Sequence, residues 1–171
     1  EHAGVYSLAG MICLELQQFP QAVAHLRRAT ELDPSRADFA TMHAKALLAG
    51  HLSGPARQEA DRATALKPQD PMALGVLGMV YVQTQAHEQA VTAFREAVSL
   101  APTSTSHRLN LAASLTAIGD FDTAERELEA CIKLDEGSWY AHLSLARLRR
   151  QTADSNHLAR LQTLLTRHRH E

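Results

Sequence analysis

The stretch DPMALGVLGMVYVQTQAHEQAVTAFREAVSLAP, residues 70–102, carries the pattern that decides the fold. Its first half places apolar and small residues at the i, i+3, i+4, i+7 spacing of one helix face: Leu74, Leu77, Gly78 and Tyr81. After a break at residues 85–87, helical spacing returns at Ala90, Phe94, Ala97 and Val98. Asp70 is placed to cap the first helix, and Pro71 suits the first helical position. The stretch therefore predicts two helices joined by a short turn.

The same pattern recurs along the chain with a period of 34 residues. The segments ELDP, ALKP, SLAP and KLDE stand at 31–34, 65–68, 99–102 and 133–136. A ladder of small residues keeps the same step: Gly10, Ala44, Gly78, Ala112 and Ala146. We expect these small residues to let the two helices of each unit approach closely. The period predicts an all-α array of antiparallel helix pairs, with four repeats in residues 1–138, at 3–36, 37–70, 71–104 and 105–138.

Composition excludes several classes of protein. The 171 residues are 45% apolar and carry 17 Lys+Arg against 19 Asp+Glu, so there is no broad basic surface for nucleic acid. Two cysteines cannot build a disulfide framework, and no apolar stretch approaches the roughly 20 residues of a membrane span. The chain opens at Glu1 with neither an initiator Met nor a leader segment. We therefore expect a cytoplasmic fragment that lacks its native N-terminus.

Residues 139–171 follow the repeat less closely. Leu158, Leu161, Leu164 and Leu165 still form one apolar helical stripe, which predicts a degenerate fifth repeat or a capping hairpin. Charge also changes here, because residues 1–138 hold 11 Lys+Arg and 17 Asp+Glu, whereas residues 139–171 hold 6 and 2. The basic end is either a solvated cap or a docking site for an acidic partner or neighbouring domain.

Motifs that would indicate an enzyme are missing from the sequence. No two of the ten histidines are three or four residues apart, the spacing that a helical zinc site needs. The glycines build neither a phosphate-binding loop nor a dinucleotide fingerprint, and no serine lies in a GxSxG motif. We predict no catalytic residue, no metal site, no cofactor and no enzymatic activity for this segment.

The repeat resembles the tetratricopeptide repeat, whose 34-residue unit places Leu, Gly and Tyr in a first helix and Ala, Phe, Ala and Pro in a second. Residues 71–104 match with Leu77, Gly78, Tyr81, Ala90, Phe94, Ala97 and Pro102, and the likeness extends over residues 3–138. It implies a right-handed α-α superhelix, a solenoid of antiparallel helix pairs. It also implies a concave surface, lined by the first helices, where partner peptides lie.

The stripe of each first helix that would face this surface is unusually apolar. All four methionines fall on it, and methionine suits adaptable apolar contacts. Alternatively, some of these positions pack against a neighbouring first helix. We expect the partner-binding groove to comprise Leu8, Met11, Met42, Lys45, Met72, Val76, Met79, Leu109, Asn110, Arg147 and Arg150.

These observations predict an interaction scaffold that binds a protein or peptide, in the form of an apolar or amphipathic helix. Self-association, or docking of another part of the same polypeptide, would use the same groove. A second interpretation is the non-catalytic N-terminal part of a larger enzyme. Residues 145–165, LARLRRQTADSNHLARLQTLL, resemble the stretch after the repeats in bacterial proteins that join such repeats to a sulfotransferase domain. A third, an assembly factor for an envelope machine, has no specific residue in its support.

Overall fold

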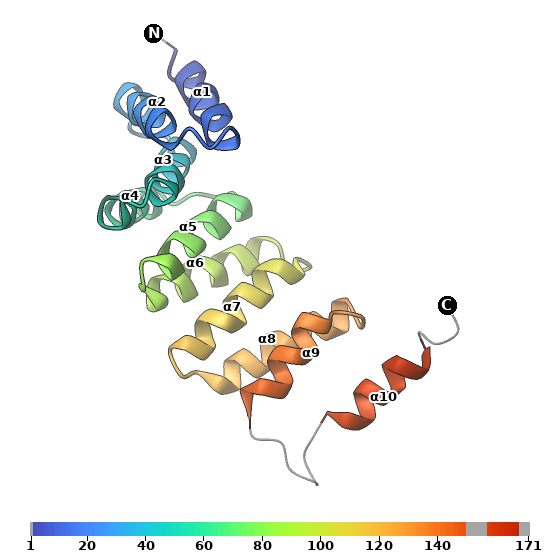
Figure 1. Cartoon of the computed structure of the whole chain (residues 1–171). Coiled ribbons are helices and arrows are strands. Elements are labelled where there is room, and N and C mark those ends of the chain that lie inside the picture. Colours follow the sequence, from blue (N-terminus) through green and yellow to red (C-terminus); the bar gives the residue numbers. More distant parts are fainter. Residues whose placement is uncertain (1, 150–156, 168–171) are drawn as a thin grey trace. The chain divides into compact units, whose positions relative to one another are not determined.

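The computed structural model describes residues 2–149 and 157–167, and within them helices are the regular secondary structure. They form two compact units, Glu1–Pro102 and Thr103–Glu171 (Figure 1). The first unit holds α1 (Ala3–Glu15), α2 (Phe19–Leu32), α3 (Ala37–Ala49), α4 (Ser53–Ala65), α5 (Pro71–Gln83) and α6 (His87–Leu100). The second holds α7 (Thr105–Ala117), α8 (Phe121–Leu134), α9 (Trp139–Leu148) and α10 (Leu158–Arg167).

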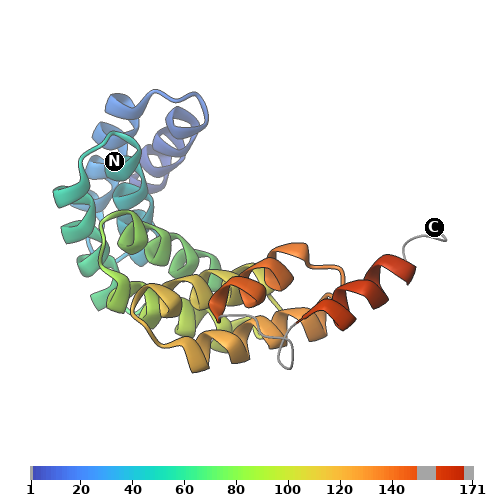
Figure 2. The ribbon, with the colours of Figure 1, turned by 60° about the horizontal axis from the view of Figure 1, so that its bottom comes forward.

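Consecutive helices pack as antiparallel pairs, α1 with α2, α3 with α4, α5 with α6 and α7 with α8 (Figure 2). Within the first unit, α2 also contacts α3, α4 contacts α5, and the first helices α1, α3 and α5 contact one another in order. In the second unit, α8 contacts α9. Within a unit, each helix of these pairs therefore packs against its partner, and the pair also packs against the following helix pair or helix.

The two helices of a pair meet closest at the small-residue ladder. A Cβ added to Gly78 would lie 2.6 Å from two ring carbons of Phe94 on α6, and one added to Gly10 would collide with Leu26 on α2. Ala44 and Ala112, at the equivalent positions of α3 and α7, are buried. The expectation that small residues permit close helix approach is confirmed at these contacts.

Local signals at helix ends also act as the sequence indicates. The Asp70 carboxylate accepts hydrogen bonds from the backbone N–H groups of Met72 and Ala73, at 3.2 and 3.1 Å, and Pro71 occupies the first turn of α5. Ser104 and Asp120 cap α7 and α8 in the same way. The predicted N-cap at Asp70 is confirmed.

The turn inside each of the first four pairs uses one left-handed residue, again at a step of 34. Its φ angle is 57° at Gln17, 60° at His51, 59° at Gln85 and 83° at Gly119. The N–H of the following residue donates to a carbonyl five residues back, as in Gln18 to Cys13 at 2.8 Å and Ala86 to Tyr81 at 2.8 Å. This bond satisfies a helix-end carbonyl, and it fixes where α2, α4, α6 and α8 begin.

A cluster of polar side chains links α3 to α4. His43 Nδ1 lies 3.1 Å from Glu59 Oε1, and Arg62 Nη2 donates to the same oxygen at 2.6 Å. Arg62 Nη1 also donates to the carbonyl of Pro34 at 3.0 Å, which ties in the connection between α2 and α3. Burial alone raises the pKa of the Glu59 carboxyl, but the hydrogen bonds from His43 and Arg62 lower it to about 2.

Gly78→Ala should destabilise the first unit, since the new methyl group overlaps the Phe94 ring. We expect a loss of about 1–3 kcal/mol in the free energy of unfolding, measured by urea denaturation. Gly54→Ala in α4 is the matched control, because an added Cβ meets nothing within 4 Å there. That change should stabilise by up to about 1 kcal/mol through helix propensity. Equal effects of the two substitutions would contradict the close approach.

Glu59→Gln should alter how stability depends on pH. A carboxyl whose pKa falls on folding contributes stability above its unfolded pKa, and that stability is lost as pH drops through the folded value. The unfolding free energy of the native chain should therefore decline between pH 5 and about 2. The variant should be less stable at pH 7 and should show a shallower decline in urea titrations. Glu31→Gln, at a carboxylate whose side chain is 50% exposed, should leave the profile unchanged.

Candidate partner-binding groove

Seven of the residues expected in the groove lie in the first unit, on α1, α3 and α5. Met11, Met72 and Met79 leave 44%, 67% and 42% of their surface exposed, and Leu8 and Lys45 are also exposed. Val76 is partly buried. Met11, Lys45 and Met79 are equivalent positions, 34 residues apart, on three first helices that contact in order. We call Leu8, Met11, Lys45, Met72, Val76 and Met79 the methionine face.

Met42 differs from the other three methionines. It is partly buried and packs against a cluster of Ala22 and Leu26 from α2 and Ala46 from α3. Ser7, Thr41 and Gly75, which also lie on the predicted stripe, are buried small residues at one equivalent position of α1, α3 and α5. The members of the stripe thus differ: Met42 packs against a cluster from α2 and its own helix, whereas Met11, Met72 and Met79 are open to solvent.

The second unit contains the remaining expected residues. Leu109 and Arg147 line one cavity of about 290 Å³, together with Ala112, Ala113, Thr116, Leu128, Ser144 and Leu148. Asn110 is partly buried and does not line this cavity; its backbone carbonyl accepts a hydrogen bond from Ser114 Oγ at 2.9 Å. Arg147 is exposed. Arg150 lies outside the described residues.

Part of the positive charge of the C-terminal segment is neutralised within the second unit. Arg149 pairs with Asp122 and, at 2.8 Å, with Glu125 of α8. Arg160 of α10 pairs with Glu129 at 2.9 Å. The sequence showed the excess of basic residues but not these partners, because each acid lies 24 to 31 residues before the arginine that it pairs with. They favour a cap that packs on α8 over a free basic surface.

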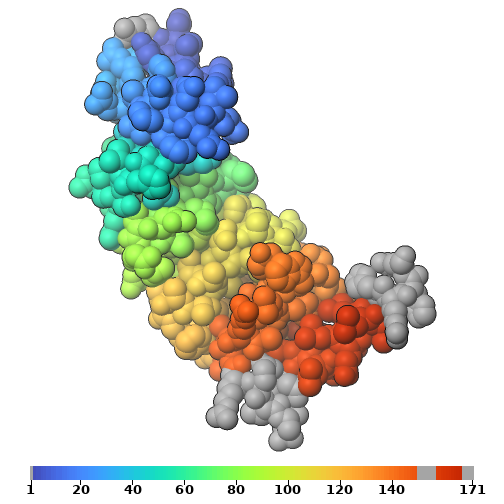
Figure 3. Space-filling model, viewed as in Figure 1, coloured from blue at the N-terminus to red at the C-terminus, as the bar shows by residue number. Residues whose placement is uncertain are grey.

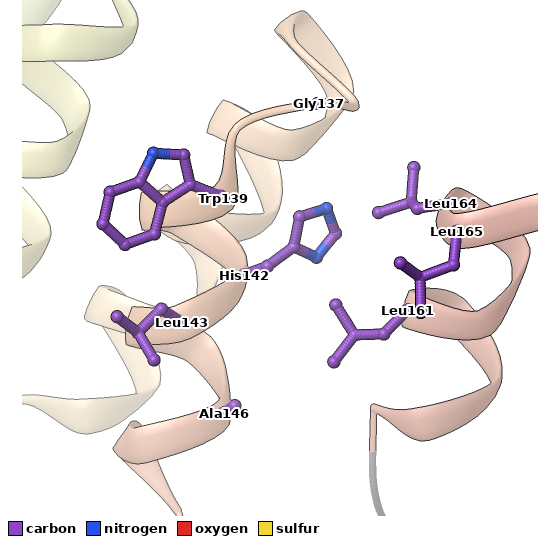
Figure 4. A pocket seen from close by; sticks show the side chains of 8 residues that line it. All are labelled: Gly137, Trp139, His142, Leu143, Ala146, Leu161, Leu164 and Leu165. Carbon is purple, nitrogen blue, oxygen red and sulfur yellow. The ribbon is translucent and has the colours of Figure 1, made fainter. Parts of the chain in front are cut away.

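An apolar cavity of about 440 Å³ lies between α9 and α10, and sequence reasoning did not anticipate it (Figures 3 and 4). His142 of α9 points toward Leu161, Leu164 and Leu165 of α10 across it, and the other lining residues are Gly137, Trp139, Leu143 and Ala146. Ala146 belongs to the small-residue ladder but is only partly buried, unlike Ala44 and Ala112. Of the predicted leucine stripe, Leu161 and Leu164 are partly buried, whereas Leu158 and Leu165 leave 62% and 72% of their surface exposed.

Features that would support catalysis are scarce in the described part of the chain. No group of three or more His, Cys, Asp or Glu side chains is placed to hold a metal ion there. Cys131 Sγ donates to the carbonyl of Thr105 at 3.5 Å, and burial raises the pKa of this thiol to about 11. Among the described helices, none combines the length and apolar character of a membrane span.

The repeat pattern and the paired helices match a known family. Profiles of the tetratricopeptide repeat match residues 3–36 and 41–105. The chain belongs to the tetratricopeptide repeat family. Its all-α fold is that of this family, which agrees with the expectation from the 34-residue period.

Solved structures show the same tetratricopeptide repeat fold. YrrB, described as a tetratricopeptide repeat protein with an unusual peptide-binding site, superposes with a TM-score of 0.73 at 20% identity, over 84% of this chain and 74% of its own. A MamA protein gives 0.74 at 18%, over 85% and 80%. MamA from Desulfovibrio magneticus RS-1, from residue 41 to its end, gives 0.76 at 16%, over 96% and 92%. None of the curated proteins compared with the chain matches it. At these identities the likeness concerns the fold.

Ala146→Leu should fill part of the cavity between α9 and α10. We expect the thermal midpoint of the second unit to rise by about 2–4 °C, because cavity filling commonly adds about 0.5–2 kcal/mol. Trp139, the single tryptophan, reports locally through its fluorescence. Ala117→Leu, at an exposed position of α7, is the control and should change little. A lower midpoint for Ala146→Leu would show that α10 packs closely on Ala146 after all.

Proposed function

We propose that this chain is a protein-interaction module whose methionine face binds an apolar or amphipathic helix. The observation that carries the proposal is the exposure of Met11, Met72 and Met79 on first helices that lie side by side. A surface that only met water would carry polar residues at these positions. Exposed apolar side chains that cluster on one face are typical of protein-binding sites.

The chemistry of the face defines the kind of partner. Thioether side chains adapt to differently shaped apolar groups, so they favour contact with leucine, isoleucine or aromatic side chains. Lys45 lies on α3, which contacts both α1 with Met11 and α5 with Met79, and its side chain is exposed. An acidic residue of the ligand would pair with it there. The best-fitting ligand has two apolar patches on either side of a carboxylate.

The dimensions of the face suit a short helix. Packed helices lie roughly 8–10 Å apart, so a ligand crossing from α1 to α5 spans about 20 Å. A helix covers this span with roughly 13 residues. YrrB, which has a related fold, is described as having a peptide-binding site. That description supports a peptide as ligand without fixing its position on this chain.

The test replaces Met11, Met72 and Met79 together with serine. Peptides of 15 random residues displayed on phage are first selected on the native chain, and their affinities are measured by fluorescence anisotropy. The triple variant should bind them at least about tenfold more weakly, because three apolar contacts each contribute on the order of 0.5–1 kcal/mol. Its helical circular dichroism should remain, since the three side chains are exposed. Met42 is left intact because it packs against the core cluster.

A matched control tests whether the loss of any two exposed apolar side chains weakens peptide binding, or only the loss of those on the methionine face. Leu52 and Leu100 are exposed apolar residues of the first unit that lie off the first-helix stripe. Leu52→Ser with Leu100→Ser should leave peptide affinity unchanged. If the methionine variant binds as tightly as the native chain, the face is not the binding site. The same conclusion follows if the leucine control loses affinity equally.

The interpretation as the N-terminal part of a sulfotransferase concerns polypeptide beyond Glu171 and stays a prediction. The same holds for self-association through the groove and for the cytoplasmic compartment. The sulfotransferase and compartment predictions do not bear on the experiment above, whereas self-association through the groove would compete with the peptide.

A further inference from the structure

A second apolar surface lies on α1, away from the methionine face. Val5 and Ile12 leave 64% and 51% of their surface exposed. They lie seven residues apart, which is two helical turns, so they share one side of α1. Of the residues equivalent to them by steps of 34, seven are buried, namely Phe39, Ala46, Ala73 and Val80 in the first unit and His107, Ser114 and Ala141 in the second, and the eighth, Leu148, is partly buried.

The first unit shows what covers these equivalent residues. Ala46 of α3, the counterpart of Ile12, lies in a cluster with Ala22 and Leu26 of α2. The second helix of each pair contacts the first helix of the following one, α2 with α3 and α4 with α5. In the second unit, α8 contacts α9 in the same way. In α3, α5 and α9, the residues equivalent to Val5 and Ile12 thus lie on a helix that is packed against the preceding second helix.

The composition of α1 does not suit the end of an array. Its sequence, AGVYSLAGMICLE, contains one charged residue, and Leu16 directly after it is also exposed. A terminal repeat that faces water needs a polar outer side to remain soluble. α1 instead resembles the inner first helices, with apolar residues on the side where α3 and α5 receive their cover.

We propose that the Val5–Ile12 face of α1 docks the second helix of a further repeat, placed before α1 in the same polypeptide. The occupant carries the stripe that α2 shows at Ala22, Leu26 and Ala29: a small residue, a large apolar residue four positions on and a small residue three beyond that. Such a helix would extend the existing α2–α3 and α4–α5 interfaces by one step of 34 residues.

A second copy of the chain offers a poorer fit. The helices with the required stripe, α2, α6 and α8, already bury it within their own units, and α4 has Ala60 where the large apolar residue is needed. α10, the remaining described helix in a second-helix position, has Gln162 where the large apolar residue is needed. A helix of the right chemistry is therefore better supplied by an additional repeat than by another molecule.

The experiment adds the missing helix in register. Glu1 and His2 are replaced by a second copy of residues 19–36, which comprise α2 and its connection to the next helix, joined directly to Ala3. The thermal midpoint should rise by roughly 6 °C or more, since two large apolar side chains become buried. Amide hydrogen exchange in α1 should slow by about tenfold or more, because the end helix no longer frays.

Matched variants of the extended chain identify the face. Val5→Ser with Ile12→Ser should remove both gains, and circular dichroism on the unextended chain checks that this variant folds. Met11→Ser, on the methionine face of the same helix, should retain them. An extension that adds no stability overturns the proposal, as does a gain that survives the double substitution.

A dimer of the unextended chain that forms through Val5 and Ile12 would also overturn it. Light scattering after size exclusion should give one copy, with and without Val5→Ser and Ile12→Ser. A dimer abolished by those two substitutions would assign the face to a second copy. Because the methionine face is unchanged in these variants, failure here is distinguishable from failure of the proposed function.

Discussion

The packing of the helix pairs depends on one kind of contact. In it, a glycine or alanine of the first helix lies against a large side chain of the second helix. At Gly78 the α5 backbone lies so close to the Phe94 ring that there is no room for a Cβ, and Gly10 meets Leu26 in the same way. This approach sets the separation of the two helices. It also sets which residues of the first helix remain for the next pair and which remain for a ligand.

Where the large partner is missing, charged groups contribute instead. Ala44 on α3 meets a second helix with Ala60 at the position of Phe94, and both alanines are fully buried. This pair is the one held by His43, Glu59 and Arg62. The α3–α4 pair, with its smaller apolar contact, thus gains orientation from hydrogen bonds, which are directional where apolar packing is not. The α7–α8 pair has both, because Leu128 is buried at the position of Phe94 and Arg108 also bonds Glu127 at 2.6 Å.

Much of the fold could be predicted from the sequence because it is local and repeated. Asp70 and Pro71 specify a helix start within a few residues, and Gly78 and Phe94 recur in register with their equivalents. The partner of His43 could not be predicted, since it depends on how α3 crosses α4. The partial burial of Met42 could not be predicted either, because it depends on how α2 packs against α3. The positions of the groove residues in relation to a ligand remain predictions.

The left-handed turn residues affect the free energy of unfolding of the chain. Gln17, His51 and Gln85 adopt a conformation that costs a residue with a Cβ roughly 1 kcal/mol, whereas Gly119 adopts it almost without cost. Three of the four turns thus include this conformational cost, and only the turn with Gly119 avoids it. The chain tolerates this because each turn is exposed and its hydrogen bond is complete. Glycine at Gln17, His51 or Gln85 would avoid this cost, so these turns are not at their thermodynamic optimum.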